Sequence, residues 1–149
     1  MAATRKLHEP ASVVAERRLE WSDTDASGVF HNTAAFRLFE MAESLLLSRL
    51  GFLDDVYHRL PRVRIEADFL AALRFRDLVE VALRVTDVGR TSARYAVEIR
   101  TGGAVAVRGT VVVVLLAEPG GSPVEWPAAY RELLLGAGPQ APERLVDGG

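Results

Sequence analysis

The sequence predicts an α+β fold in which an antiparallel sheet is wrapped around one long helix. Residues 32–50 have helical spacing without Gly or Pro, and apolar side chains cover most of the helix circumference. Such a helix is expected to be buried. Residues 62–117 switch to the alternating pattern of strands, broken by short turns, so successive strands should pair antiparallel. A twisted sheet that curls around the helix satisfies both patterns.

Length and composition narrow the class of protein. The 149 residues suit a single domain spanning 1–149, with loose tails expected at 1–10 and 136–149. The net charge of −2 argues against nucleic acid as a partner. No apolar stretch approaches the ~18 residues of a membrane helix, so no membrane partner is expected. The N-terminus also lacks the apolar segment of a secretory signal, and a cytoplasmic localisation follows as the expectation.

The first half of the chain is predicted to contain a strand and a polar turn ahead of the long helix. Residues 12–21 alternate as a strand with one mostly polar face, and residues 22–31 form a polar turn. Asn32 fits the N-cap of the helix, and Gly51 fits the residue that ends it. The segment that follows, residues 52–60, reads as a short helix or a loop.

The second half supplies most of the sheet. Glycine-containing turns separate four predicted strands, at residues 62–70, 78–88, 91–101 and 104–117. Gly109 lies inside the last of these and indicates a bulge or bend. Val111–Leu116 reads as an edge that needs cover, which favours a homodimer. Residues 127–135 fit a short helix with Pro127 at its first position.

Asp25 is the candidate for chemistry, because it lies just ahead of a helix whose first N–H groups are free. It is either a base or nucleophile at the helix mouth or a carboxylate that stabilises a turn. Gly28 would permit close backbone approach, and Phe30, His31 and Asn32 lead into the free N–H groups.

The other polar side chains have competing interpretations. Asp23 reads as structural, and His31 as a general acid–base, a substrate contact or a polar residue near the cap. Glu40 either pairs with Arg37 on the helix surface or lines a substrate pocket, and the same choice applies to Glu43. The turn residues Arg90, Thr91 and Ser92 either close a hairpin or hold a phosphate.

Several other chemistries lack their motifs. The chain has no Cys, which excludes thiolate nucleophiles and Cys metal sites. The GxSxG, GxGxxG, GxxxxGK[ST] and HExxH motifs are also missing. No metal and no cofactor are therefore expected.

The stretch WSDTDASGVFHNTAAFRLFEMAE resembles the signature of the 4-hydroxybenzoyl-CoA thioesterase-like family, acyl-CoA thioesterases of the hotdog fold. The match rests on Asp23-Thr24-Asp25-Ala26-Ser27-Gly28 and the helix after it. The resemblance implies a five-stranded antiparallel sheet around the helix, in a homodimer or homotetramer. It also implies that Asp25 is the catalytic carboxylate and that backbone N–H groups around His31 and Asn32 polarise the thioester carbonyl. Pantetheine would follow a groove between subunits, and Arg90 would meet the CoA phosphates.

The match has two departures that bear on function. Many relatives carry a Tyr-His pair after the Gly-Val segment, where this chain has Phe30-His31-Asn32. A polyketide-releasing subgroup has Asn at the place of Asp25, so Asp25 favours ordinary acyl-CoA hydrolysis. The expected function is therefore hydrolysis of acyl-CoA or acyl-carrier-protein thioesters. The alternatives are a non-catalytic acyl-CoA-binding or regulatory module and a polyketide-pathway carrier-protein thioesterase.

Overall fold

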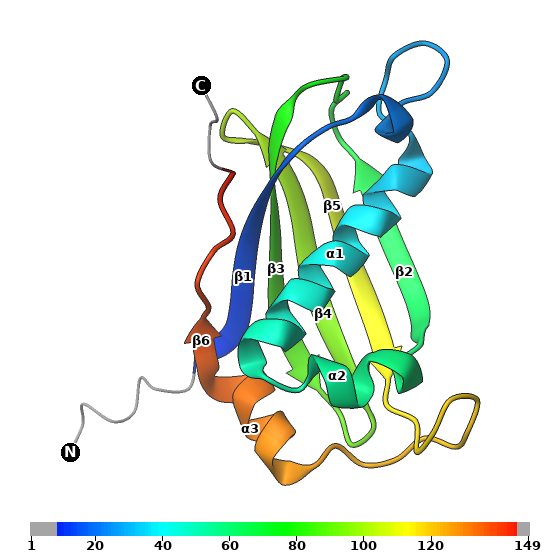
Figure 1. Ribbon diagram of the computed structural model, residues 1–149, viewed down its shortest axis with the longest axis vertical. Coiled ribbons are helices and arrows are strands. Elements are labelled where there is room, and N and C mark those ends of the chain that lie inside the picture. The colour runs from blue at the N-terminus through cyan, green and yellow to red at the C-terminus, as the bar shows by residue number, and fades with distance from the viewer. Residues whose placement is uncertain (1–8, 146–149) are drawn as a thin grey trace, which may run out of the picture.

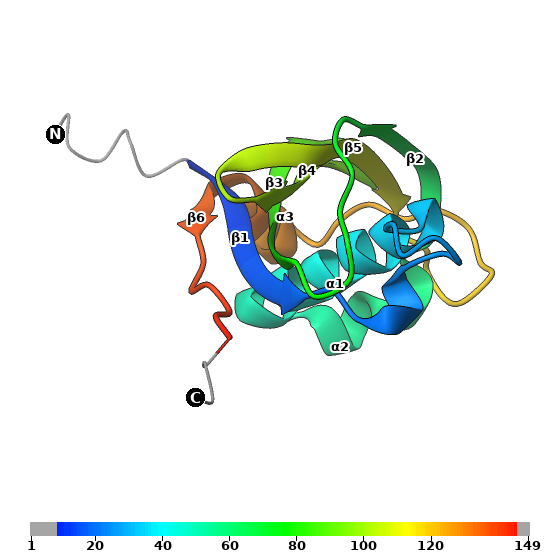
Figure 2. The same cartoon turned by 90° about the horizontal axis from the view of Figure 1, so that it is seen from above.

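The computed structural model describes residues 9–145, in which one curved sheet wraps around the helix α1 (Asn32–Leu50) (Figures 1 and 2). The strand order is β2-β5-β4-β3-β1-β6. The bounds are β1 Glu9–Arg18, β2 Arg62–Phe69, β3 Leu78–Val88, β4 Ser92–Thr101, β5 Ala104–Val114 and β6 Ala137–Pro139. The first five strands in this order pair antiparallel, as the sequence predicts.

The sixth strand was not predicted. β6 pairs parallel with β1, and Glu143 continues this pairing opposite Ala15. Arg144 then contacts the carboxylates of Glu16 and Glu80. Residues 9–10 and 136–145 are therefore part of the fold and not loose tails. The remaining tail residues, 1–8 and 146–149, lie outside the described residues.

α1 is buried on the side that faces the sheet. Its buried residues are Ala34, Ala35, Phe39, Ala42, Glu43, Leu46 and Leu47. Phe36 and Glu40 lie on the opposite side and are exposed. The sequence pattern therefore predicted a more completely buried helix than the structure has. Gly51 ends the helix in the left-handed conformation, with φ of 92°, as predicted.

Gly109 lets the helix approach the sheet closely. A Cβ at this position would lie 2.7 Å from a ring atom of Phe39 and 2.7 Å from the Glu66 carbonyl oxygen. Pairing at Gly109 is regular, opposite Ala67. The predicted bulge there is wrong, and the β4–β5 register slips between Ile99 and Arg100 instead.

The exposed edge of the sheet is β2. β5 lies between β2 and β4, so the prediction that Val111–Leu116 forms an edge is wrong. Three large apolar side chains of β2 are at least one-third exposed, namely Val63, Ile65 and Phe69. An exposed apolar edge is a surface that another chain or a ligand can cover. Within residues 9–145, no helix combines the length and hydropathy that crossing a membrane requires.

Shorter elements close the far end of the barrel-like core. α2 (Leu53–Val56) and the 3-10 turn η3 (Tyr57–Arg59) follow α1, and α3 (Ala128–Gly136) follows a long loop. Pro127 is the N-cap of α3, one position before the place predicted for it. Arg131 donates to the carbonyls of Val88 and Gly89, which fastens α3 to the β3–β4 turn.

Candidate active site

A tight loop delivers Asp25 to the start of α1. The loop begins with the 3-10 turn η2 (Trp21–Asp23). The Asp25 N–H then donates to the Val29 carbonyl at 2.8 Å, and the Gly28 N–H donates to the Asp25 carbonyl at 3.0 Å. Gly28 has φ of 82° and open space where a Cβ would lie. The left-handed backbone accounts for glycine at this position, and the close approach that the sequence suggested stays a prediction.

The carboxylate of Asp25 is held by the loop that follows it. Oδ1 accepts from the Ser27 N–H at 2.8 Å and from the Ser27 hydroxyl at 2.6 Å. A weaker bond comes from the Val29 N–H at 3.4 Å. The Ser27 hydroxyl and N–H lower the pKa of Asp25, because they bind the ionised form. Within the described chain Oδ2 accepts no such bond, so the turn occupies one oxygen and leaves the other free.

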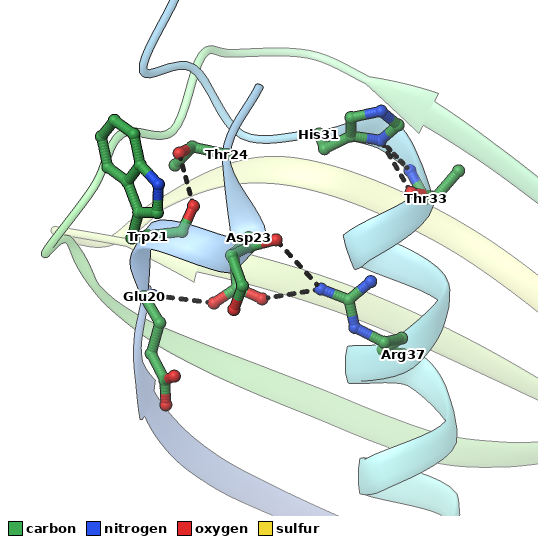
Figure 3. A network of polar contacts seen from close by, with 8 residues as sticks. Glu20, Trp21, Asp23, Thr24, His31, Thr33 and Arg37 are labelled. Atoms are coloured by element: carbon green, nitrogen blue, oxygen red, sulfur yellow. Dashed lines mark hydrogen bonds and ion pairs between the residues drawn. The ribbon is translucent and has the colours of Figure 1, made fainter. Parts of the chain in front are cut away.

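His31, and not Asn32, is the N-cap of α1 (Figure 3). Its Nδ1 accepts from the Thr33 N–H at 3.1 Å, and the Thr33 hydroxyl lies 2.7 Å from the same atom. Because Nδ1 already accepts the amide hydrogen, the Thr33 hydroxyl donates to it as well. The neutral ring then carries its hydrogen on Nε2. His31 therefore stabilises the helix start and presents an N–H donor.

The cap leaves one backbone amide of α1 unused. The Thr33 N–H bonds the His31 ring, and the Ala34 N–H bonds the His31 carbonyl at 2.9 Å. The Asn32 N–H has no hydrogen-bond partner within residues 9–145. A free amide at the positive end of a helix is a donor for a developing oxyanion.

A cavity of about 310 Å³ lies at the start of α1, with Asn32 in its wall. It is lined by Val29, Phe30, Asn32 and residues 69–73. The Phe30 N–H donates to the Leu73 carbonyl at 2.8 Å, which joins the two walls. The sequence pattern identified the wall before α1 but missed residues 69–73. The sequence predicted the end of a strand at residues 69–70 and the start of a turn at residue 73, and no motif in this segment pointed to the site.

Asp23 stabilises the loop, because both of its carboxylate oxygens accept hydrogen bonds. Its Oδ2 accepts from the Glu20 N–H at 2.7 Å, and its Oδ1 accepts from Arg37 Nη2 at 3.0 Å (Figure 3). The His31 N–H donates to the Asp23 carbonyl at 2.8 Å. These hydrogen bonds support the structural interpretation of Asp23. They also give Arg37 a different partner from the predicted Glu40.

Glu40 and Glu43 lie farther along α1, away from the Asp25 loop. Glu40 Oε2 lies 2.9 Å from Arg62 Nη1, and Glu43 Oε1 accepts from Arg62 Nη2. Both acids therefore pair with β2 and not with their own helix. Sequence reasoning could not find this pairing, because the partner lies 19 residues from Glu43 in a separate strand.

The turn between β3 and β4, which contains Arg90 and Thr91 and leads into Ser92, lies at the opposite end of the sheet from the loop before α1 (Figure 1). The Ser92 carbonyl accepts from the Trp126 ring N–H at 3.0 Å, and the Thr91 carbonyl accepts from the Leu115 N–H at 2.8 Å. Arg90 is exposed, with Glu125 3.8 Å away. Within one chain the structure does not bring these residues to the helix start.

A larger hollow of the described chain, about 630 Å³, lies elsewhere. Its walls include Ser12, Ala82, Ala96 and Thr110, which alternate with core residues and so face away from α1. It contains no residue of the Asp25 loop, whereas the smaller cavity is lined by Val29, Phe30 and Asn32. Across residues 9–145, no three His, Asp or Glu side chains gather as a metal site would require.

Comparison with protein families identifies the chain. The family model of the thioesterase superfamily matches residues 27–107, more than half of the 149 residues. The chain belongs to the thioesterase superfamily. The match includes Gly28, the whole of α1 and strands β2 to β4. A comparison with curated proteins finds no significant match.

Solved structures share this hotdog fold of the superfamily. A predicted thioesterase from Bacillus stearothermophilus is 24% identical with a TM-score of 0.75, and covers 83% of this chain and 93% of its own. A DHNA-CoA thioesterase from Staphylococcus aureus is 21% identical with a TM-score of 0.74, at 83% and 91% coverage. A thioesterase from Thermus thermophilus, complexed with coenzyme A and zinc, is 28% identical with a TM-score of 0.70, at 80% and 90% coverage.

Proposed function

We propose that this protein hydrolyses acyl-CoA thioesters, with Asp25 as its catalytic carboxylate. The observation that carries the proposal is the unpartnered Asn32 N–H at the wall of the 310 Å³ cavity. A thioester carbonyl placed in this cavity would meet a backbone donor at the positive end of α1. The Asp25 loop immediately precedes that donor.

Hydrolysis needs an attacking oxygen and a stabilised carbonyl. Attack at the carbonyl carbon moves negative charge onto the carbonyl oxygen, which the Asn32 N–H would receive. Collapse of this intermediate breaks the C–S bond and releases the thiolate. Where Asp25 is the attacking group, the acyl group remains on its carboxylate as an anhydride, which water then cleaves to give the free acid and Asp25; where water attacks, the free acid forms directly. In both cases water supplies the oxygen of the acid and the proton of the thiol. Thr33 and Ala34 are committed to the cap, so the Asn32 amide is the donor that the helix has left.

The environment of Asp25 keeps its carboxylate ionised. Ser27 lowers the pKa of the carboxyl group, and the ionised form can either attack the carbonyl carbon or take a proton from the attacking water. Its Oδ2 is the oxygen free to react, because Oδ1 is bound by Ser27. His31 would contribute through its cap and through the Nε2 hydrogen, and not as a base.

The expected homodimer would complete the substrate groove. The exposed apolar side chains Val63, Ile65 and Phe69 lie on the edge strand that leads into the cavity wall. A second copy that covered this edge would also enclose the acyl group. Arg90 at the far end of one chain would be available to CoA phosphates only if the partner brought it near, and we keep it as a proposed phosphate contact on that condition.

A thiol-release assay tests the function. Purified protein would be mixed with aromatic, branched and straight-chain CoA esters, and with acyl-carrier-protein esters, while free thiol is followed with a chromogenic reagent. We expect turnover of at least one CoA ester and its loss in Asp25→Ala. The matched control is Asp54→Ala, which removes an exposed acid of α2.

Two results would reject the proposal. Saturable acyl-CoA binding without thiol release across the whole panel would indicate a binding module. Turnover that survives in Asp25→Ala would place the chemistry on another residue.

A further inference from the structure

The middle of α1 carries a buried carboxylate that the proposed reaction does not use. Glu43 is 3% exposed and is the one charged side chain among residues 9–145 that is buried. Its helix neighbours Ala42, Leu46 and Leu47 belong to the apolar core. A buried carboxylate is costly unless a charge and hydrogen bonds compensate it. The partners of Glu43 therefore determine its role.

One arginine holds Glu43 and its neighbour on the helix surface. Arg62 Nη2 donates to Glu43 Oε1, and Arg62 Nη1 lies 2.9 Å from Glu40 Oε2. The Arg62 side chain is 25% exposed, and that of Glu40 is 56% exposed. The guanidinium therefore joins a buried and an exposed acid of α1 to the first residue of β2.

A bulge in β2 directs Arg62 toward the helix. Arg64 pairs with Val112 of β5, but Arg62 pairs with Val113, so Val63 has no partner of its own. Val113 is fully buried, and Arg62 occupies the core-facing position opposite it. Regular alternation would give that position to Val63, which is instead 59% exposed. Bulges commonly redirect a side chain in this way.

The buried end of the cluster holds two incompletely bonded oxygens. Glu43 Oε2 and the Tyr95 hydroxyl are both buried and have no hydrogen-bond partner in the described chain. Each nevertheless affects the pKa of the other, so the two groups lie close together. A small side-chain rotation would let the Tyr95 hydroxyl donate to Oε2.

Four titratable side chains face Glu43 or share its cavity. Arg62 approaches from β2, Tyr95 from β4 and Glu40 from its own helix, while Tyr57 of η3 lines the same small cavity. Burial raises the pKa of Glu43, and the Arg62 charge only partly opposes this. When Glu43 accepts a proton, Arg62 loses its buried partner and keeps only the exposed Glu40.

We propose that Glu43 and Arg62 form a proton-dependent contact that fixes the start of edge strand β2 to α1. The contact is present while Glu43 is ionised, and its loss on protonation loosens β2. β2 pairs with β5 alone and presents Val63, Ile65 and Phe69 to the outside. A change in its attachment would therefore alter the exposed apolar edge of the sheet.

Amide hydrogen exchange tests this contact without any substrate. Protection factors would be measured for residues 62–69 of β2, with residues 92–101 of the central strand β4 as internal reference, across a pH series. In the unmodified protein we expect β2 protection to fall roughly three- to tenfold relative to β4 as Glu43 is protonated. The titration of the Glu43 carboxyl carbon, followed by NMR, gives the pH of that step independently.

Three variants assign the step to its residue. Glu43→Gln keeps the shape but cannot be ionised, so the step should vanish and β2 protection should stay near the low-pH value throughout. Tyr95→Phe removes a hydroxyl that lowers the pKa of Glu43, so the step should move to higher pH. Glu40→Gln removes the exposed acid on the same guanidinium and should keep the step.

Other outcomes would overturn the proposal. A step that persists in Glu43→Gln, or that disappears in Glu40→Gln alone, would assign it to another acid. Parallel changes in β2 and β4 would show that the whole sheet responds. None of these results depends on whether Asp25 hydrolyses a thioester.

Discussion

The two acids Asp25 and Glu43 belong to the same helix region but lie in opposite environments. Asp25 precedes α1, is exposed, and has a pKa lowered by Ser27 donors. Glu43 lies within α1, is buried, and has a pKa raised by the loss of water. The loop supplies hydrogen-bond donors to the charged form, whereas the core supplies one arginine and leaves one oxygen unbonded. The same chemical group is thus suited to reaction in one place and to proton binding in the other.

Gly28 and Gly109 show a similar contrast between the start and the middle of α1. Gly28 is needed for its left-handed φ and has free space around it, whereas Gly109 is needed for space against Phe39. The start of α1 is therefore constrained by backbone conformation, and its middle by packing. Each constraint fails in a different way when the residue is changed.

The largest expected effect separates the two acids by activity. Asp25→Asn should lower turnover by roughly 10²–10⁴-fold, the range that loss of a general base or comparable catalytic group gives. Stability should change by less than about 0.5 kcal/mol, because the side chain is exposed and an amide oxygen can still accept from Ser27. Glu43→Gln in the same thiol-release assay should change turnover by less than about tenfold, since no reacting group is removed. Similar losses in both variants would refute the division of roles.

Substitution by Asn should recover part of the lost stability at position 28 but not at position 109. Gly109→Ala should destabilise the protein by about 1–3 kcal/mol, because the added methyl overlaps the Glu66 carbonyl and the Phe39 ring. Gly28→Ala should cost roughly 1–2 kcal/mol through its left-handed backbone. Asn tolerates that backbone, so Gly28→Asn should recover part of the loss while Gly109→Asn should not. Urea unfolding at one pH measures all four variants, and recovery at Gly109 would contradict the packing argument.

The raised pKa of Glu43 should determine the direction in which the free energy of unfolding changes with pH. Its pKa in the folded state is raised above the ordinary value of 4.5, so the folded protein binds the proton more tightly than the unfolded chain. This contribution to stability is complete below the unfolded pKa and is lost as pH rises through the folded pKa. Across that window, Glu43→Gln should therefore gain stability relative to the unmodified protein as pH rises, by at most about 1.4 kcal/mol per pH unit.

This pH window is separate from the one in which the acids with lowered pKa values affect stability. Asp25, Asp55 and Glu98 have lowered pKa values and affect stability at lower pH, with the opposite sign. Complete unfolding returns Glu43 to water, so protonation of Glu43 strengthens the fold as a whole. Detachment of β2 alone removes Arg62 while the core still covers Glu43, so protonation loosens β2 locally. Urea unfolding of both proteins across the pH series gives the difference directly. A flat difference would mean that Arg62 fully offsets the burial of Glu43, and would contradict this sign.

The sequence predicted what local pattern determines. The long helix, the five antiparallel strands and the turn at residues 102–103 follow from periodicity and glycine placement. The motif around Asp25 predicted the family, which the match to the thioesterase superfamily confirms. Long-range partners were beyond this reasoning, because neither the pairing of β6 with β1 nor that of Glu43 with Arg62 has a local signal. The N-cap was misplaced by one residue because a His ring took the role that Asn32 could have filled by propensity.

The smallest expected effect concerns that cap and separates its two possible roles. His31→Ala removes the acceptor for the Thr33 N–H and should cost roughly 0.5–1 kcal/mol. His31→Asn should restore stability, because an Asn side chain accepts the same hydrogen bond. If His31 acts only by fixing the helix start, turnover should recover in His31→Asn together with stability. If the Nε2 hydrogen contacts the reacting group, stability should recover while turnover stays low. Both variants keep Asp25 and the Asn32 amide, so the comparison isolates the ring from the rest of the helix start.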